Sequence, residues 1–176
     1  LYAGTLDCQK QGAAIAINTA RYLPNNYIIH ILGFGTSQDL SYTKNLIDEI
    51  NKQYGVTKVI YEGIKSVSYT HLKFIQKCQI GLSTQNMDAS FNDTSFPSKI
   101  LSYMSNGLEV VSANIGVVKN SKISQYIHFY EVQDEKEIAN VILNINLNAK
   151  SNNVDVVKEL DKEFKEDLKA MLVRYE

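Results

Sequence analysis

Short apolar runs alternate along the chain with longer stretches in which apolar residues recur every three or four positions. The run at residues 27–32, YIIHIL, is almost continuously apolar, which is typical of a strand buried on both faces of a parallel sheet. Six such runs predict strands at residues 1–6, 27–32, 56–61, 78–83, 108–112 and 127–132. The intervening and following stretches predict helices at residues 11–23, 40–54, 66–77, 135–147 and 154–175.

A further helix is predicted within DTSFPSKILSYMSNGLEVVS, residues 93–112, which leads from a polar loop into the fifth strand. Ser95 is the expected N-cap, and Pro97 suits the first helical turn. Gly107 supplies a left-handed stop. The helix N-terminus is rich in hydroxyl groups and carries Lys99. Its free N–H groups and partial positive charge would suit a phosphate.

The regular alternation of strands and helices predicts an α/β fold with a Rossmann-like, doubly wound parallel sheet of about six strands. In such sheets a ligand lies outside the carboxyl ends of the strands. Polar or glycine-bearing turns follow the predicted strands at residues 4–5, 33–35, 62–63 and 84–95. We therefore expect these turns to share one edge of the sheet and to form the functional site.

The chain has 176 residues, of which 44% are hydrophobic and 21% charged, with a formal net charge of −1. This balance is that of an ordinary soluble domain and argues against a nucleic-acid-binding surface. Cys8 and Cys78 lack the spacing of a zinc or redox motif, so we expect reduced thiols. No apolar run reaches the ~20 residues of a membrane-spanning helix. Because the chain opens at Leu1 directly with a strand, we expect a domain of a longer protein.

Two other functions share parts of this pattern. The GFG at residues 33–35 suggests dinucleotide binding, but Gln38 stands where the G-x-G-x-x-G motif needs its third glycine, so a plain turn is favoured. A phosphorylated receiver domain needs an acidic pair after its first strand and an aspartate after its third, and the sequence supplies neither. The three histidines lie within strand or helix patterns, where a structural or solvated role is favoured.

The stretch FPSKILSYMSNGLEVVS, residues 96–112, resembles the PSK-L-EYM-A-GKPVV-S signature of family 4-like retaining glycosyltransferases of the GT-B fold. That signature belongs to their C-terminal, nucleotide-sugar-binding half, and the similarity runs from residue 1 to about residue 132. The resemblance implies a donor-binding domain at residues 1–150 and a charged helix at residues 151–176 that packs on it. The N-terminal GT-B half would be absent, and part of the last helix would await it.

The resemblance also gives the turns specific roles. After the first strand, Gly4 matches the family, and Thr5 stands where the family has an arginine. Lys10 approximates a lysine that neutralises the donor's diphosphate, and residues 63–66 match a loop whose backbone reads the nucleotide base. The donor-binding residues implied in this way are Gly4, Thr5, Lys10, Gly63, Ile64, Ser95, Phe96, Pro97, Ser98, Lys99 and Ser102.

Two family glutamates are missing. Thr94 and Ser102 occupy the positions at which relatives hold the transferred sugar and the ribose. Asp88 and Asp93 lie nearby and offer substitute carboxylates, although loop carboxylates are commonly just solvated. Ser102 can still hydrogen-bond a ribose, but loss of the charged acceptor costs about 1–2 kcal/mol of binding. The chain thus fits either an active enzyme with altered donor binding or a degenerate, non-catalytic nucleotide-sugar binding module.

The resemblance implies sugar transfer from a nucleoside diphosphate sugar to an acceptor hydroxyl, with retention, in the synthesis of bacterial polysaccharides or glycolipids. It implies no metal and no cofactor beyond the donor, and the D-x-D triplet of metal-dependent glycosyltransferases does not occur. The acceptor, a sugar or lipid-linked sugar, would bind the missing half, so no catalytic residue is assigned and the isolated domain is expected to be inactive. The expected location is the cytoplasm, with any contact to the inner membrane made through the missing half.

Overall fold

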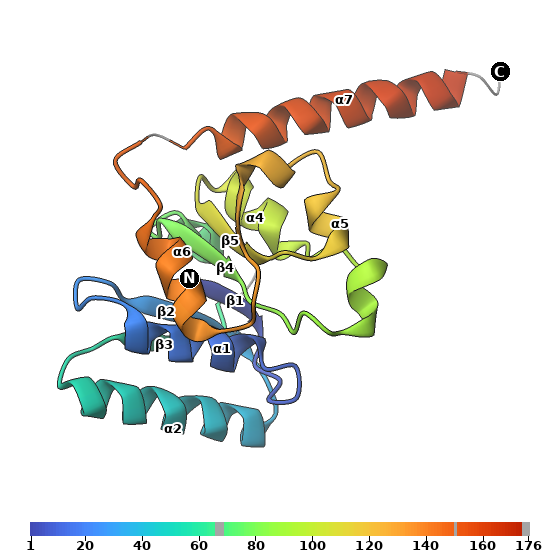
Figure 1. Ribbon diagram of the computed structural model, residues 1–176. Helices are drawn as coiled ribbons and strands as arrows, with labels where there is room; N and C mark the ends of the chain where they lie inside the picture. Colours follow the sequence, from blue (N-terminus) through green and yellow to red (C-terminus); the bar gives the residue numbers. More distant parts are fainter. Residues whose placement is uncertain (66–68, 150, 174–176) are drawn as a thin grey trace.

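The computed structural model describes residues 1–65, 69–149 and 151–173. Ser66, in the turn expected to read the base, and Tyr175, at the expected end of the last helix, lie outside these residues. The described chain forms an α/β fold in which parallel strands are covered by helices on both faces (Figure 1). The predicted fold class is confirmed.

The strands form two three-stranded parallel sheets, in the orders β1-β2-β3 and β4-β5-β6. Their bounds are β1 (Tyr2–Thr5), β2 (Ile29–Phe34), β3 (Val59–Gly63), β4 (Ile80–Ser83), β5 (Glu109–Ala113) and β6 (Ile127–Tyr130). Leu1 joins the two sheets, because its amino group donates to the Ile80 carbonyl at 2.8 Å and its carbonyl accepts from the Leu82 N–H at 2.8 Å. β1 and β4 therefore lie side by side at the centre, where the chain changes its winding direction.

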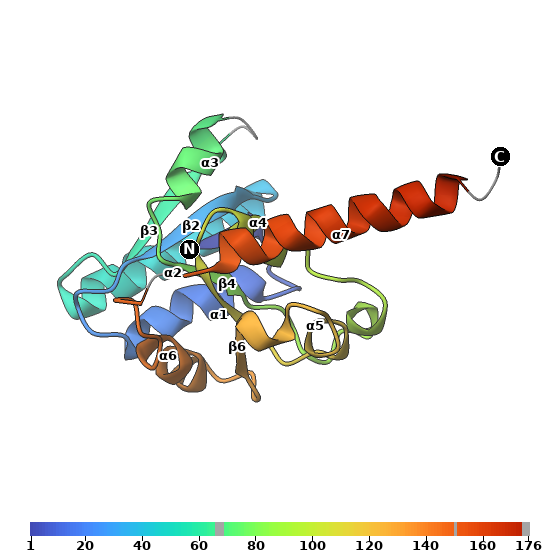
Figure 2. The ribbon, with the colours of Figure 1, turned by 90° about the horizontal axis from the view of Figure 1, so that it is seen from above.

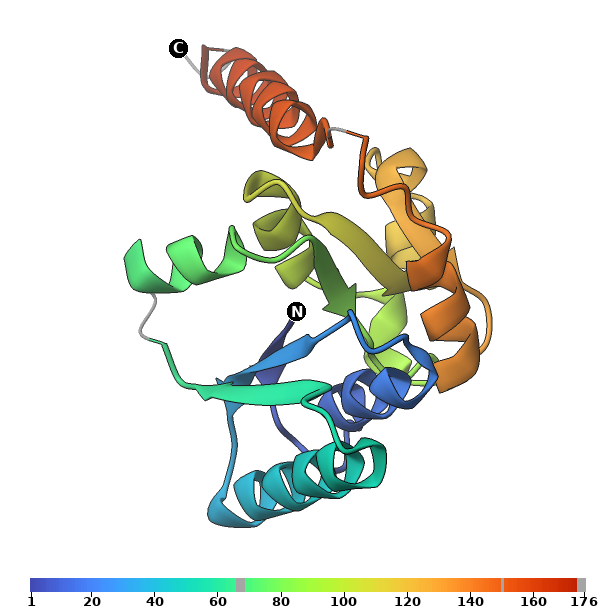
Figure 3. The same cartoon turned by 90° about the vertical axis from the view of Figure 1, so that its left-hand side faces the viewer.

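Helices cover both faces of this arrangement (Figure 3). The α-helices are α1 (Gly12–Thr19), α2 (Ser37–Tyr54), α3 (Tyr69–Ile75), α4 (Lys99–Ser105), α5 (Gly116–Lys119), α6 (Glu135–Leu143) and α7 (Asn153–Val173), and the 3-10 turns are η1 (Ala20–Tyr22), η2 (Ser90–Asp93) and η3 (Ser124–Tyr126). α1 packs between α2 and α6 on one face, whereas α4 packs on β4 and β5 from the other. The fold is thus doubly wound, as the sequence predicts.

Helix boundaries differ from the prediction where a local signal decides them. α2 begins at Ser37 rather than residue 40, because the Thr36 hydroxyl and the Asp39 carboxylate form a reciprocal capping box. The helix predicted over residues 135–147 ends at Leu143, and the one predicted over residues 11–23 continues beyond Thr19 only as a 3-10 turn.

Ser95 is not the N-cap of α4, so that prediction is wrong. The helix begins at Lys99 with Ser98 at the N-cap position, and the Ser98 side chain makes no capping hydrogen bond. The residue before a proline is disfavoured in helical conformation, so Pro97 delays the helix past Phe96. At the other end Gly107 has a φ of 86°, which confirms the left-handed stop.

α7 packs on α4 and then extends past the body of the molecule (Figure 2). Val156, Val157 and Leu160 at its start lie against the core. Farther along, Phe164 and Leu172 are each 64% exposed. The apolar stripe of this helix is therefore covered only at its N-terminal end.

Candidate functional site

Two cavities lie at the carboxyl ends of the strands. The large cavity, of about 450 Å³, lies between the ends of β1 and β2, the loop after β3, α3 and α4. It is lined by Ala3, Gly4, Leu32, Gly33, Phe34, Ile64, Lys65, His71, Ile75, Ser98, Lys99, Ser102 and Tyr103. The small cavity, of about 280 Å³, lies between the loops that follow β1 and β4. It is lined by Tyr2, Thr5, Gln9, Lys10, Gly12, Thr84, Gln85, Asn86, Ala89 and Lys99.

Lys99 lines both cavities. Its ammonium nitrogen lies 4.6 Å from the centroid of the Tyr2 ring, and the ion pairs of the described chain give it no carboxylate partner. Burial lowers the pKa of Lys99 to about 8. An anion bound here would restore the charged form, so the position suits a phosphate that reaches from one cavity to the other.

Tyr2 and Tyr103 fix the wall around Lys99. The Tyr2 hydroxyl donates to the Thr5 carbonyl at 2.9 Å, and the Tyr103 hydroxyl accepts from the Ala3 N–H at 2.8 Å. Burial raises the pKa of Tyr2 to about 12 and that of Tyr103 above its usual value. Both phenols therefore stay neutral near pH 7, and the Tyr103 hydroxyl ties α4 to β1.

The loop after β1 is held by two aspartates. Asp7 accepts from the Gln9 and Lys10 N–H groups at 2.8 and 3.2 Å. Asp39, at the start of α2, accepts from the Cys8 N–H at 3.1 Å. The hydrogen bond between the side chains of Cys8 and Asp39 raises the pKa of Cys8 to about 11 and holds that of Asp39 well below its usual value. The loop thus places Lys10 in the wall of the small cavity and keeps Cys8 a thiol.

The opposite wall of the small cavity is rich in amides. The Thr84 hydroxyl donates to the Gly12 carbonyl at 2.7 Å, and Gln85 Nε2 donates to Asn92 Oδ1 at 2.6 Å. A Cβ atom on Gly12 would lie 2.4 Å from the Thr84 carbonyl oxygen, so only glycine permits this approach. Amide groups with both donors and acceptors match the hydroxyl groups of a sugar.

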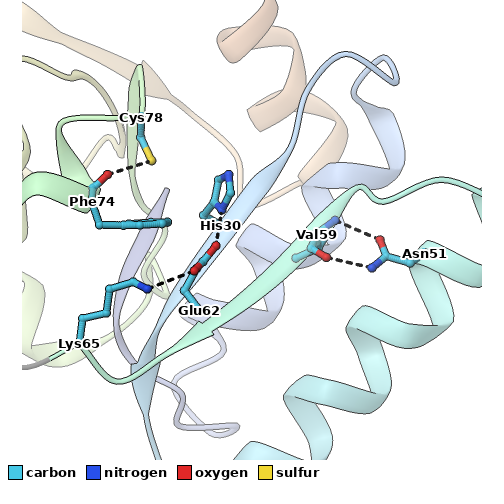
Figure 4. A network of polar contacts seen from close by, with 7 residues as sticks. All are labelled: His30, Asn51, Val59, Glu62, Lys65, Phe74 and Cys78. Atoms are coloured by element: carbon cyan, nitrogen blue, oxygen red, sulfur yellow. Dashed lines mark hydrogen bonds and ion pairs between the residues drawn. The ribbon is translucent and has the colours of Figure 1, made fainter. Parts of the chain in front are cut away.

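At the far side of the large cavity, Glu62 joins β2 to the loop after β3 (Figure 4). His30 Nδ1 lies 2.9 Å from Glu62 Oε1, and Lys65 Nζ donates to Glu62 Oε2 at 3.2 Å. The Lys65 ammonium also lies 4.6 Å from the centroid of the Phe74 ring. Burial by itself would raise the pKa of Glu62, but the hydrogen bonds from His30 and Lys65 bring it below its usual value.

The structure brings seven of the residues implied by the resemblance into these walls. Gly4, Ile64, Ser98, Lys99 and Ser102 line the large cavity, and Thr5, Lys10 and Lys99 line the small one. Gly63, Ser95, Phe96 and Pro97 are not among the lining residues of either. Gly63 instead turns the chain toward Ile64 with a φ of 72°.

Sequence reasoning missed Tyr2, Lys65 and His71 as wall residues. Tyr2 lies inside an apolar strand pattern, and His71 lies in a helix, so neither carries a local signal. Lys65 belongs to the turn that the sequence singles out, but there only the backbone is assigned a role. The position of these side chains depends on packing between strands and helices far apart in the sequence.

Of the two expected substitute carboxylates, Asp88 lines neither cavity. Thr94 and Asp88 are exposed, and the side chain of Asp93 lies outside the described residues. Within that same part of the molecule, no group of three histidine, cysteine or acidic side chains is arranged to hold a metal. No helix there is long and apolar enough to cross a membrane.

Known structures share this fold. HepE from Anabaena in complex with UDP superposes with a TM-score of 0.68 at 17% identity, over 96% of this chain and 48% of that one. An α,α-trehalose-phosphate synthase (UDP-forming) from Burkholderia vietnamiensis gives 0.63 at 12% identity, over 97% and 44%. The E. coli trehalose-6-phosphate synthase bound with UDP-2-fluoro glucose gives 0.61 at 16% identity, over 96% and 43%.

The chain has the fold of one Rossmann-like half of a GT-B glycosyltransferase. It spans about half the length of these solved structures. No protein-family model and no curated protein matches the sequence. At these identities the likeness concerns the fold alone.

Proposed function

We propose that this chain is the donor-binding half of a glycosyltransferase, which transfers a sugar from a nucleoside diphosphate sugar to an acceptor hydroxyl. The observation that carries the proposal is Lys99, a cation without an acidic partner among the described residues, placed where two cavities meet. UDP and UDP-2-fluoro glucose are bound by the solved structures named above, which supports a nucleotide-sugar donor here.

The two cavities divide the donor between them. The nucleoside occupies the large cavity, where Phe34 and Ile64 form an apolar rim and the Ser102 hydroxyl reaches the ribose. The diphosphate lies between Lys99 and Lys10, and the sugar lies in the small cavity against amide groups. As the bond to the sugar breaks, negative charge grows on the diphosphate, and the two lysines stabilise it without a metal.

The resemblance of residues 96–112 to the glycosyltransferase signature supports the remaining parts of the proposal. Transfer proceeds with retention and serves polysaccharide or glycolipid synthesis in the cytoplasm. A sugar or lipid-linked sugar acceptor binds outside this chain, because both cavities at this edge are taken by the donor. This chain alone then binds the donor but does not turn it over.

A second candidate is a non-catalytic nucleotide-sugar binding module. It is favoured by one observation, the lack of any carboxylate among the described residues that line the two cavities. Such a module would still bind the donor. An activity assay of the full-length protein distinguishes the two candidates, because transfer of a sugar to any acceptor would exclude the non-catalytic module.

Calorimetric titration with UDP, GDP, TDP and ADP tests the shared claim of donor binding. We expect saturable binding of at least one of them, weakened by Lys99→Met and unchanged by Lys52→Met. Lys52 is an exposed lysine at the end of α2, so its replacement changes the net charge equally. If none of the four binds at millimolar concentration, the donor-binding proposal is wrong.

A further inference from the structure

The large cavity has an end that carries more hydrogen-bonding capacity than the protein uses. Lys65 and His71 both line it, from the loop after β3 and from α3. His71 Nδ1 is buried and has no hydrogen-bond partner among the described residues. Leaving a buried polar atom unpaired is unfavourable, so this end of the cavity is suited to a ligand with polar groups on its edge.

Lys65 is held in one arrangement by its neighbours (Figure 4). Glu62 Oε2 accepts one of its ammonium protons at 3.2 Å, and the Phe74 ring lies 4.6 Å from its nitrogen. Glu62 is itself fixed, because its other oxygen lies 2.9 Å from His30 Nδ1. The side chains of Glu62 and Lys65 are 19% and 28% exposed, so the pair is largely shielded from water.

An ammonium group can only donate hydrogen bonds, and one donor is already used on Glu62. The remaining N–H groups of the ammonium can pair with an oxo oxygen on a nucleobase, but they are repelled by an exocyclic amino group, which is also a donor. A neutral imidazole can accept from a ring N–H that adjoins an oxo group. Uracil and thymine present this pair of groups, whereas cytosine presents an amino group at the same place.

We propose that Lys65 is a specificity-determining residue that selects donors whose nucleobase carries an oxo group beside a ring N–H, where cytosine has an amino group, and that Glu62 is the residue that positions Lys65. The inference rests on the proposed function, since it assigns the base of the donor to the large cavity. Recognition of the base would then involve the Lys65 side chain as well as the backbone of this loop. Uridine and thymidine diphosphates are then favoured over cytidine diphosphate.

Titration calorimetry with UDP and CDP tests the selection, because the two bases differ only at the oxo or amino group and at the adjoining ring nitrogen, which carries a proton in uracil but not in cytosine. We expect this chain to bind UDP roughly tenfold more tightly than CDP. Lys65→Met, which keeps the length of the side chain without its charge, is expected to bring the two affinities within about twofold by weakening UDP. Lys52→Met serves as the control for net charge and is expected to keep the full preference.

Two Glu62 variants test the positioning role. Glu62→Gln keeps an oxygen that accepts from Lys65 and is expected to retain most of the preference for UDP, whereas Glu62→Ala is expected to lose it. Inorganic pyrophosphate, which has no base, shows whether the cleft stays folded, and its affinity is expected to be equal in wild type and in all Glu62 and Lys65 variants. If Glu62→Ala keeps the preference, the positioning role is wrong.

Equal affinities of the wild type for UDP and CDP, or an undiminished preference in Lys65→Met, overturn the assignment of Lys65 while donor binding itself stands. Absence of binding by UDP, CDP and pyrophosphate alike overturns the proposed function, and the base selection falls with it. A preference that is lost in Lys65→Met and kept in Lys52→Met supports the inference.

Discussion

Replacing Lys99 by methionine is the perturbation with the clearest expected effect. A charge-assisted hydrogen bond contributes about 1.5–3 kcal/mol, so Lys99→Met is expected to weaken UDP binding roughly 10- to 150-fold at pH 7. Because burial lowers the pKa of Lys99 to about 8, about nine tenths of the free protein carries the charge at pH 7 and about one tenth at pH 9. Wild-type affinity for UDP is therefore expected to fall about tenfold between these pH values.

The pH profile separates a direct role of Lys99 from an indirect one. Calorimetric titration from pH 7 to pH 9 is expected to show the tenfold fall in the wild type and a nearly flat affinity in Lys99→Met. Tyr2 and Cys8, with pKa values raised to about 12 and about 11, stay protonated over this range. A profile that is the same in both proteins would refute the reasoning that the Lys99 ammonium meets the diphosphate.

The same residue is expected to lower the stability of the empty protein. Its pKa falls from 10.5 to about 8 on folding, so the folded state favours the neutral amine, and stability rises with pH between these values. At pH 7 the uncompensated charge corresponds to at most about 3 kcal/mol, less where solvent reaches the ammonium. Urea denaturation at pH 7 is therefore expected to show Lys99→Met at least as stable as the wild type. A marked loss of stability would mean that the contact with Tyr2 outweighs the cost of burial.

Three further predictions concern the scaffold of the site. A Cβ on Gly81 would lie 2.3 Å from the Tyr103 ring, so Gly81→Ala is expected to cost about 1–3 kcal/mol in urea denaturation, whereas Gly116→Ala, with open space around it, is expected to change little. Lys58→Met removes the buried ammonium that donates to the carbonyls of Ala20 and Leu23. This is expected to cost about 1–3 kcal/mol of stability in the same assay, and no loss of stability relative to Lys52→Met would count against a stabilising role of these hydrogen bonds. Because the pKa of Glu62 is lowered on folding, its contribution to stability is present above its unfolded pKa and is lost as pH falls through its folded pKa. Glu62→Gln is therefore expected to lose less stability than the wild type on acidification below about pH 4.5. Parallel curves of stability against pH for the two proteins would contradict this.

The sequence predicts the fold of this chain well because the alternation of apolar runs and helical stripes is a local signal. Each strand of a parallel sheet must be apolar by itself, and each crossover helix carries its own stripe. The start of α4 was misplaced because Ser95 is a good capping residue taken alone, while Pro97 decides where the helix can begin. The capping preference of Ser95 and the backbone restriction before Pro97 favour different helix starts, and the restriction decides.

The candidate site could be predicted only in part. Turns after parallel strands share one edge whatever their sequence, so Gly4, Lys10 and Lys99 are placed together from topology alone. Lys65 and His71 could not be assigned, because their roles arise from a cavity that α3 and the loop after β3 line together and from the hydrogen bond between Glu62 and Lys65. Contacts of that kind depend on side-chain geometry between elements, which no pattern along the chain records.

The most direct test of the donor-binding claim is an NMR titration of the ¹⁵N-labelled chain with UDP. We expect saturable amide shifts at residues 4–12, 63–65 and 98–103, around the two cavities, with residues 24–28 and 145–149 at the opposite edge of the sheet unchanged. Shifts confined to that opposite edge, or no saturable shifts at millimolar UDP, would contradict the claim that the cavities joined by Lys99 hold the donor.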